Sequence, residues 1–110
     1  MQITQKKEGE VYIFSLDGRF DAHCAGEVEE KLNSAISEGS RKLLIDLEKC
    51  EYISSAGLRV LLAVTKKLNK EGGMIKLCSL QSYVKEVFDV AGFTQILKIY
   101  HTCPEAVQSF

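Results

Sequence analysis

The segment Leu43–Leu47 constrains the fold more than any other part of the sequence, because it is apolar on both faces of an extended chain. Apart from Asp46 it holds only leucine and isoleucine. A strand that other layers cover on both sides has such a continuous apolar run, whereas a half-exposed strand alternates apolar and polar residues. Met74–Cys78 has the same character. We therefore expect two adjacent, buried, parallel strands, with a helix crossing between them in the right-handed sense.

Three segments have the periodicity of amphipathic helices, with apolar residues three and four positions apart. They cover residues 25–38, 55–69 and 82–91, and glycines follow each of them. A capping box with proline in the first turn, residues 102–105, opens a short fourth helix. The expected core positions of the first helix are Ala25, Val28, Leu32, Ala35 and Ile36.

The N-terminal residues predict a β-hairpin, with strands at 3–6 and 11–16, and a last short strand is expected at 96–99. Strands that alternate with helices after a hairpin indicate the α/β class. We expect a single domain over residues 1–110. Its mixed sheet should have four to five strands, parallel at the centre, packed by about four helices.

Composition narrows the classes of partner. The formal net charge is -1, from 14 basic and 15 acidic residues spread through the chain, so no electrostatic footprint for nucleic acid or an anionic membrane is present. No apolar run is long enough to span a bilayer. We therefore expect a protein or small-molecule partner and no membrane insertion. The 4 cysteines form no C-x-x-C pair and no signal-like segment opens the chain, which predicts reduced thiols and a cytoplasmic location.

Two adjacent serines, Ser54 and Ser55, stand where the second helix is expected to begin. The first N–H groups of a helix have no partner within it, and together with the helix dipole they favour an oxygen ligand or a negative charge. A serine at this position is therefore a helix cap or a phosphate acceptor, and the helix-terminus argument does not choose between neighbours. We expect the loops 17–21 and 48–53 to converge here, because sites gather at the carboxyl ends of parallel strands.

Catalysis is disfavoured by the residues at hand. The only histidines are His23 and His101, and the G-x-S-x-G elbow of a serine hydrolase is absent. Neither Cys24 nor Cys50 lies in a short loop that closes on an arginine, as a cysteine phosphatase would require. No glycine-rich phosphate loop or metal-ligand cluster is evident. We expect no enzymatic activity, no metal and no cofactor.

Four segments, in order along the chain, have the pattern of one known family: an opening strand with a G-x-hydrophobic-D loop at residues 11–21, a central strand at 44–47, a phosphorylation loop at 52–58 and a third helix at 84–93. On these segments the whole chain resembles the STAS domain family in its stand-alone form, the anti-sigma factor antagonist. The resemblance implies a partner switch: the unmodified domain binds an anti-sigma factor that is also a serine kinase, and phosphorylation of one serine breaks the complex. A phosphatase is a second candidate partner, and the free domain is expected to be a monomer.

By motif position the resemblance implies Ser55 as the phosphate acceptor, with Ser54 as second choice and Asp21 beside it. Many antagonists carry an aspartate immediately before the acceptor, where this chain has Ser54. Gly57 suits either close approach of a partner or packing of the helix. Alternative functions on the same fold are a subunit of a lipid-transport ABC system and part of a stress-signalling scaffold. The expected partner-binding residues are Asp21, Ser54, Ser55, Ala56, Gly57, Leu58 and Arg59.

Overall fold

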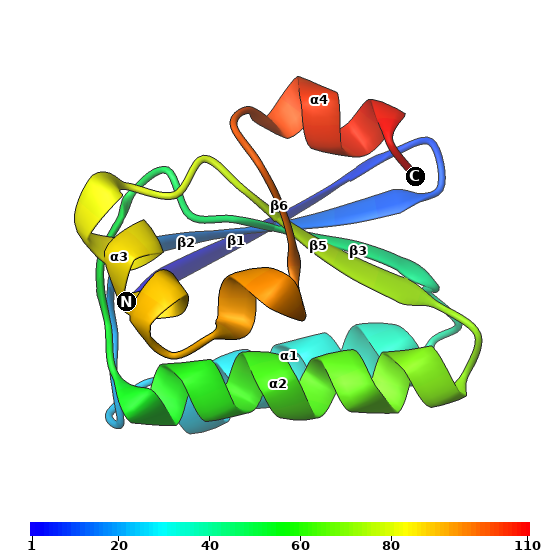
Figure 1. Ribbon diagram of the computed structural model, residues 1–110. Coiled ribbons are helices and arrows are strands. Elements are labelled where there is room, and N and C mark those ends of the chain that lie inside the picture. The colour runs from blue at the N-terminus through cyan, green and yellow to red at the C-terminus, as the bar shows by residue number, and fades with distance from the viewer.

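One sheet separates the helices into two groups in the computed structural model, which describes residues 1–110 (Figure 1). α1 and α2 lie side by side on one face, α4 lies on the other, and α3 covers one end. None of these helices is both long and apolar enough to cross a bilayer. The elements in chain order are β1 (Gln2–Glu8), β2 (Val11–Phe20), α1 (Ala25–Ser37), β3 (Lys42–Asp46), β4 (Cys50–Ile53), α2 (Ser55–Lys70), β5 (Met74–Cys78), α3 (Ser82–Val90), the 3-10 turn η1 (Phe93–Gln95), β6 (Lys98–Tyr100) and α4 (Cys103–Gln108).

The sheet has the strand order β1-β2-β3-β5-β6, and β4 pairs with β2 off this path. β1 and β2 form the predicted antiparallel hairpin, whereas β2, β3, β5 and β6 run parallel. The prediction that the two apolar runs are adjacent and parallel is confirmed, since Leu43 pairs with Ile75 and Ile45 with Leu77. The α/β class and the mixed sheet with parallel central strands are likewise confirmed.

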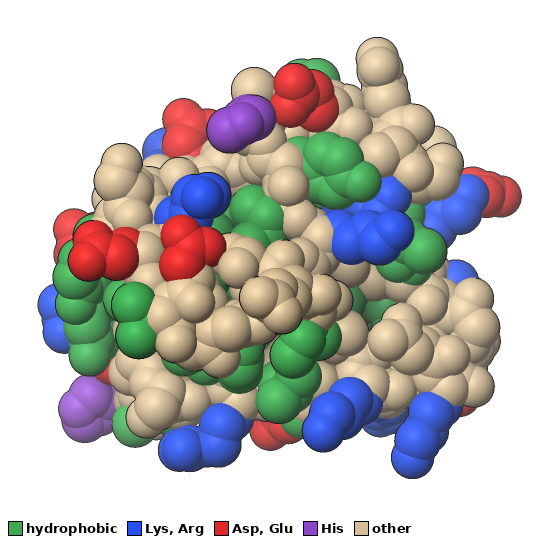
Figure 2. Space-filling model, in the orientation of Figure 1, with side chains coloured by type: hydrophobic (Ala, Val, Ile, Leu, Met, Phe, Trp, Pro, Cys, Tyr) green, Lys and Arg blue, Asp and Glu red, His purple; other side chains and the backbone are tan.

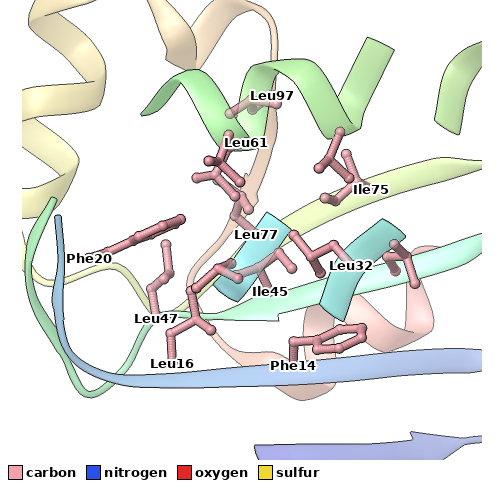
Figure 3. Packing of buried hydrophobic residues seen from close by; sticks show 14 of the residues in the cluster. Phe14, Leu16, Phe20, Leu32, Ile45, Leu47, Leu61, Ile75, Leu77 and Leu97 are labelled. Atoms are coloured by element: carbon pink, nitrogen blue, oxygen red, sulfur yellow. The ribbon is translucent and has the colours of Figure 1, made fainter. Parts of the chain in front are cut away.

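Alternation along β2 divides the interior into two clusters. Phe14 and Leu16 face α1 and α2 and belong to the larger cluster, part of which appears in Figure 3. Val11 and Ile13 face the other way and pack in the smaller cluster, together with Ala106 of α4. The five core positions expected in α1 are all buried. The sheet is therefore covered on both faces, which accounts for the continuous apolar pattern of β3.

The prediction that residues 17–21 and 48–53 are loops was wrong for most of these residues, since only Asp21, Glu48 and Lys49 lie outside strands. β2 continues to Phe20 across an irregularity in register between Gly18 and Arg19, and it pairs there in parallel with β4. Phe20 and Ile53 lie opposite each other and are 0% and 2% exposed. Burial of these two side chains holds the extension in place, because each is worth about 1.5–3 kcal/mol when removed from water.

The last strand is also displaced from its predicted position. Ile96, expected to open it, is 56% exposed, and Leu97 is the residue that packs into the core at 4% exposure. The 3-10 turn η1 occupies residues up to Gln95, and pairing with β5 begins only at Lys98. The apolar pattern Ile-Leu-Lys-Ile did not reveal which of its members faces inward.

A buried lysine fixes α4 on the sheet. Lys76 of β5 is 3% exposed, and its Nζ donates to the carbonyl oxygen of Ser109 at 2.7 Å and to its Oγ at 2.8 Å. The aromatic rings of Tyr100 and Phe110 lie 5.3 and 4.6 Å from the same nitrogen. A cation at the C-terminal end of a helix is stabilised by the free carbonyl groups and the helix dipole. Lys76 thus joins the sheet to the end of α4.

Candidate functional site

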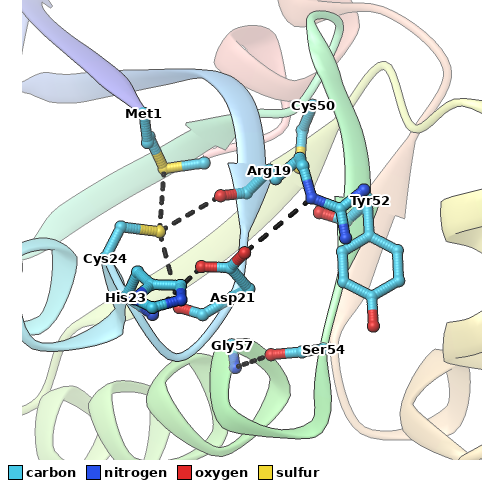
Figure 4. A network of polar contacts seen from close by, with 9 residues as sticks. All are labelled: Met1, Arg19, Asp21, His23, Cys24, Cys50, Tyr52, Ser54 and Gly57. Carbon is cyan, nitrogen blue, oxygen red and sulfur yellow. Dashed lines mark hydrogen bonds and ion pairs between the residues drawn. The ribbon is translucent and has the colours of Figure 1, made fainter.

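Ser54 caps α2. Its backbone is extended, with φ -96° and ψ 173°, and its Oγ accepts a hydrogen bond from the Gly57 N–H at 3.4 Å (Figure 4). Its own N–H donates to the carbonyl oxygen of Phe20 at 3.0 Å, which ties the start of α2 to the end of β2. Aspartate and serine are comparably good caps. Ser54 therefore caps the helix as an aspartate at this position would.

Ser55 is the first residue of α2, and its side chain is exposed. Its hydroxyl makes no side-chain hydrogen bond within the protein, in contrast to that of Ser54. The helix begins with N–H groups that favour an anion by about 0.3–1 kcal/mol. The two serines that the sequence left as alternatives thus have different surroundings, one engaged in the cap and the other open to solvent.

Gly57 is required by packing within the chain. A Cβ at this position would lie 2.8 Å from the carbonyl oxygen of Phe20 and 2.9 Å from Cγ1 of Ile53. Both distances are shorter than any that real Cβ atoms adopt. The sequence left open whether Gly57 allows close approach of a partner or packing of the helix, and these distances favour packing of the helix. The close approach places the first turn of α2 directly on the β2–β4 pair.

The other residues expected to bind a partner differ in exposure. Leu58 is 8% exposed and packs in the core, so it attaches the start of α2 to the protein interior. Ala56 is half-buried, and Arg59 is exposed. The part of this segment that a partner can reach consists of Ser55 and Arg59, with the accessible portions of Ser54 and Ala56.

Asp21 lies on the same edge but is engaged with its own loop. Its Oδ1 accepts from the His23 N–H at 3.0 Å, and its Oδ2 lies 3.8 Å from Nε of Arg19 (Figure 4). No hydrogen bond joins its carboxylate to Ser54 or Ser55. It is brought near them through the backbone, because Asp21 directly follows Phe20, whose carbonyl oxygen accepts from Ser54.

Sequence reasoning missed a row of stacked side chains at this edge. The guanidinium carbon of Arg19 lies 4.2 Å from the ring centroid of Tyr52. Tyr52 in turn stacks on Tyr83 of α3, with ring centroids 6.3 Å apart and planes inclined by 18°. Arg19 and Tyr52 become neighbours only because β2 and β4 pair, and these strands were predicted as loops. No periodicity in the sequence marks the row.

The four cysteines are free thiols. Cys50 and Cys78 are fully buried, and burial raises the pKa of both thiols. Cys103, half-buried at the start of α4, also has a pKa raised by burial. A raised pKa disfavours the reactive thiolate. No group of three histidine, cysteine, aspartate or glutamate side chains lies together as a metal site would require.

Comparison with known proteins gives consistent results. The profile of the STAS domain matches residues 2–106. BtrV of Bordetella bronchiseptica, a candidate anti-sigma factor antagonist, is 36% identical over 110 residues, covering 100% of this chain and 95% of BtrV. The anti-sigma F factor antagonist of Paenibacillus polymyxa is 28% identical, covering 91% and 86%. A candidate anti-sigma factor antagonist from Thermotoga maritima superimposes with a TM-score of 0.93 at 24% identity, covering 97% of this chain and 92% of that one.

Proposed function

The chain belongs to the STAS domain family, and we propose that it acts as an anti-sigma factor antagonist controlled by phosphorylation of Ser55. In its unmodified form it binds an anti-sigma factor that is also a serine kinase, and so frees a sigma factor for transcription. The kinase phosphorylates Ser55, and the complex dissociates. A phosphatase restores the binding form. The protein itself is a binding module with no catalytic activity.

The similarity to BtrV supports the antagonist role, because it extends over nearly the full length of both chains. The Paenibacillus polymyxa relative carries an anti-sigma antagonist name as well and aligns over most of its length. A region of similarity that covers the whole domain includes the helix start with its two serines. The lipid-transport and scaffold alternatives have no comparable support.

The different roles of the two serines carry the assignment of the acceptor. A kinase must reach the hydroxyl that it modifies, and the Ser55 side chain is exposed, whereas Ser54 is half-buried and accepts from Gly57. Phosphorylating Ser54 would place a bulky dianion where the cap now packs. At Ser55 the phosphate extends into solvent, close to the free N–H groups of the first turn.

The effect of the phosphate falls on the partner. A phosphoserine carries about 1.5–2 negative charges at neutral pH and three strong hydrogen-bond acceptors. On α2 the helix dipole favours an anion by about 0.3–1 kcal/mol. A partner packed over Ser55 and Arg59 would have to bury that charge, and an unpaired buried charge costs about 3–5 kcal/mol. That cost corresponds to a loss of at least about a hundredfold in affinity.

Affinity capture followed by phosphate mapping tests the proposal. The intact protein should retain a histidine-kinase-like serine kinase from a lysate of its own organism, and Ser55→Ala should retain it too. Ser55→Asp should bind it weakly, because one carboxylate imitates the phosphate imperfectly. Ser37→Asp, an exposed serine at the far end of α1, is the matched control and should bind normally.

The captured kinase, purified and supplied with ATP, should then add one phosphate to Ser55. Fragmentation of the modified peptide in a mass spectrometer distinguishes Ser55 from Ser54. Phosphate on Ser54, or unchanged binding by Ser55→Asp, would show that the site has been assigned incorrectly. Failure to retain any kinase would contradict the antagonist role itself.

A further inference from the structure

Arg19, Tyr52 and Tyr83 form one continuous surface, called here the Arg19–Tyr83 stripe. The three residues come from β2, β4 and α3. The Arg19 guanidinium carbon lies 4.2 Å from the Tyr52 ring centroid, and the centroids of the two tyrosine rings are 6.3 Å apart. Figure 4 shows the Arg19 guanidinium over the Tyr52 ring, on the same edge as Ser54 and Asp21. In Figure 2, hydrophobic side chains reach the surface along the edge that carries α3 and β4.

Packing of α3 does not require the aromatic ring of Tyr83. The helix is attached to the core by Val84 and Phe88, both 0% exposed, whereas Tyr83 is 54% exposed. Its ring is nevertheless stacked on that of Tyr52. Tyrosine is enriched at protein interfaces, because it supplies a large contact area at low cost in conformational entropy. An exposed tyrosine that stacks on a neighbouring ring is therefore well placed to contact a partner.

Arg19 has hydrogen-bonding capacity to spare. Its side chain is 58% exposed, and the carboxylate that pairs with it, that of Asp21, lies 3.8 Å from Nε, too far for a hydrogen bond. Glu27 and Glu51 line the same surface depression as Arg19. The guanidinium lies over the Tyr52 ring and remains exposed to solvent. A planar arginine held in this way matches a carboxylate, which it binds through two parallel hydrogen bonds.

The stripe is close enough to Ser55 to share one interface with it. Tyr52 precedes Ser55 by three residues, so their Cα atoms are at most about 11 Å apart. The Tyr83 ring adds another 6.3 Å beyond the Tyr52 ring. A protein interface of ordinary size covers about 800 Å² on each partner, which is ample to include both.

We propose that the Arg19–Tyr83 stripe is a second part of the surface that binds the anti-sigma factor. The partner places an apolar patch against Tyr83 and a carboxylate against Arg19. This inference rests on the proposed function, and it identifies contacts that lie outside the serine loop. It also assigns a role in partner choice to residues of β2, β4 and α3.

Titration calorimetry with the purified anti-sigma kinase from the capture experiment provides the test. Tyr83→Ala should weaken binding by about tenfold or more, as expected of an aromatic residue central to an interface. Arg19→Gln should also weaken binding, and the remaining affinity should depend less on salt, since an ion pair has been removed. Val90→Ala, an 85% exposed residue at the other end of α3, is the control and should bind as the intact protein does.

The outcomes separate this inference from the proposed function. Normal binding by both Tyr83→Ala and Arg19→Gln, alongside loss of binding by Ser55→Asp, would overturn the stripe and leave the antagonist role intact. Sedimentation of the free protein tests a second copy as the occupant. A dimer that Tyr83→Ala converts to a monomer would also overturn the proposal. Thermal unfolding of each variant close to that of the intact protein confirms that binding, not folding, has changed.

Discussion

Replacing Gly57 by alanine should destabilise the protein, although alanine is the better helix former. The new Cβ would lie 2.8 Å from the Phe20 carbonyl oxygen, 2.9 Å from Ile53 Cγ1 and 3.1 Å from Phe20 Cδ1. The carbonyl oxygen cannot simply move away, because it accepts the hydrogen bond from Ser54 N–H that anchors the start of α2. Relief of the clash must shift α2 or break that bond.

The size of the effect follows from two opposing contributions. Forcing an extra methyl group into a packed site costs about 1–3 kcal/mol, and contact with backbone favours the upper half of that range. The intrinsic helix propensity of alanine over glycine returns at most about 1 kcal/mol. The free energy of unfolding should therefore fall by about 1–2 kcal/mol. With an unfolding entropy of about 0.23 kcal/mol/K for a chain of 110 residues, Tm should fall by about 4–9 °C.

Gly26→Ala is the matched control for thermal unfolding followed by circular dichroism. Gly26 also lies in the first turn of a helix, but no atom is within 4 Å of its added Cβ and its φ is not positive. The same substitution should there raise stability by about 0.4–1 kcal/mol. Opposite signs at the two sites are the expected result. A Gly57→Ala protein that unfolds at or above the temperature of the intact protein would refute the packing argument.

Three further predictions concern the cap, the anchor of α4 and the buried thiols. Ser54→Ala should lower the free energy of unfolding, measured in urea, by about 0.5–1 kcal/mol, because the cap is lost. Ser55→Ala should change it by less than about 0.5 kcal/mol. Equal losses for the two variants would contradict the assignment of the cap to Ser54. Lys76→Met removes both hydrogen bonds to the end of α4, so amide exchange should accelerate in α4 more than in β3, and unchanged exchange would mean that other contacts hold the helix. Burial raises the pKa of Cys50 and Cys78 above their ordinary value of 9.0, so the folded state holds these protons more tightly than the unfolded state. The contribution of these thiols to the free energy of unfolding is therefore complete below about pH 9 and is lost as the pH rises further. Cys78→Ala should make the free energy of unfolding fall less steeply with pH in this alkaline range. An unaltered slope would exclude the Cys78 thiol as the cause of the fall.

The central fold was predictable because its signals are local. β3 is apolar on both faces at Leu43, Leu44 and Ile45, and β5 is apolar apart from Lys76. A short run of this kind favours a parallel strand that is covered on both sides. The extension of β2 and the strand β4 gave no such signal. β4 has only four residues of mixed polarity, Cys-Glu-Tyr-Ile, and its pairing with β2 joins residues more than 30 positions apart. Only the burial of Phe20 and Ile53 in three dimensions reveals it.

The location of the candidate site was predictable from the sequence, but the choice between its two serines was not. The sequence places a serine pair at a helix start, but the two neighbouring hydroxyls are equivalent on that argument alone. The structure distinguishes them because the chain is still extended at Ser54, with ψ 173°, and becomes helical at Ser55. The Arg19–Tyr83 stripe lay beyond sequence reasoning, since its members meet only through the unpredicted pairing of β2 with β4.

The uncharged cap at Ser54 bears on how tightly the unmodified form of the proposed switch can bind its partner. An aspartate cap would hold the helix equally well, but it would leave one negative charge at the start of α2 in both the unmodified and the phosphorylated protein. With serine there, the cap adds no charge, and phosphorylation of Ser55 adds nearly two negative charges at the start of α2. An acidic partner that contacts Arg19 therefore meets no carboxylate from the cap, and the unmodified protein should bind it more tightly than a protein with an aspartate cap would.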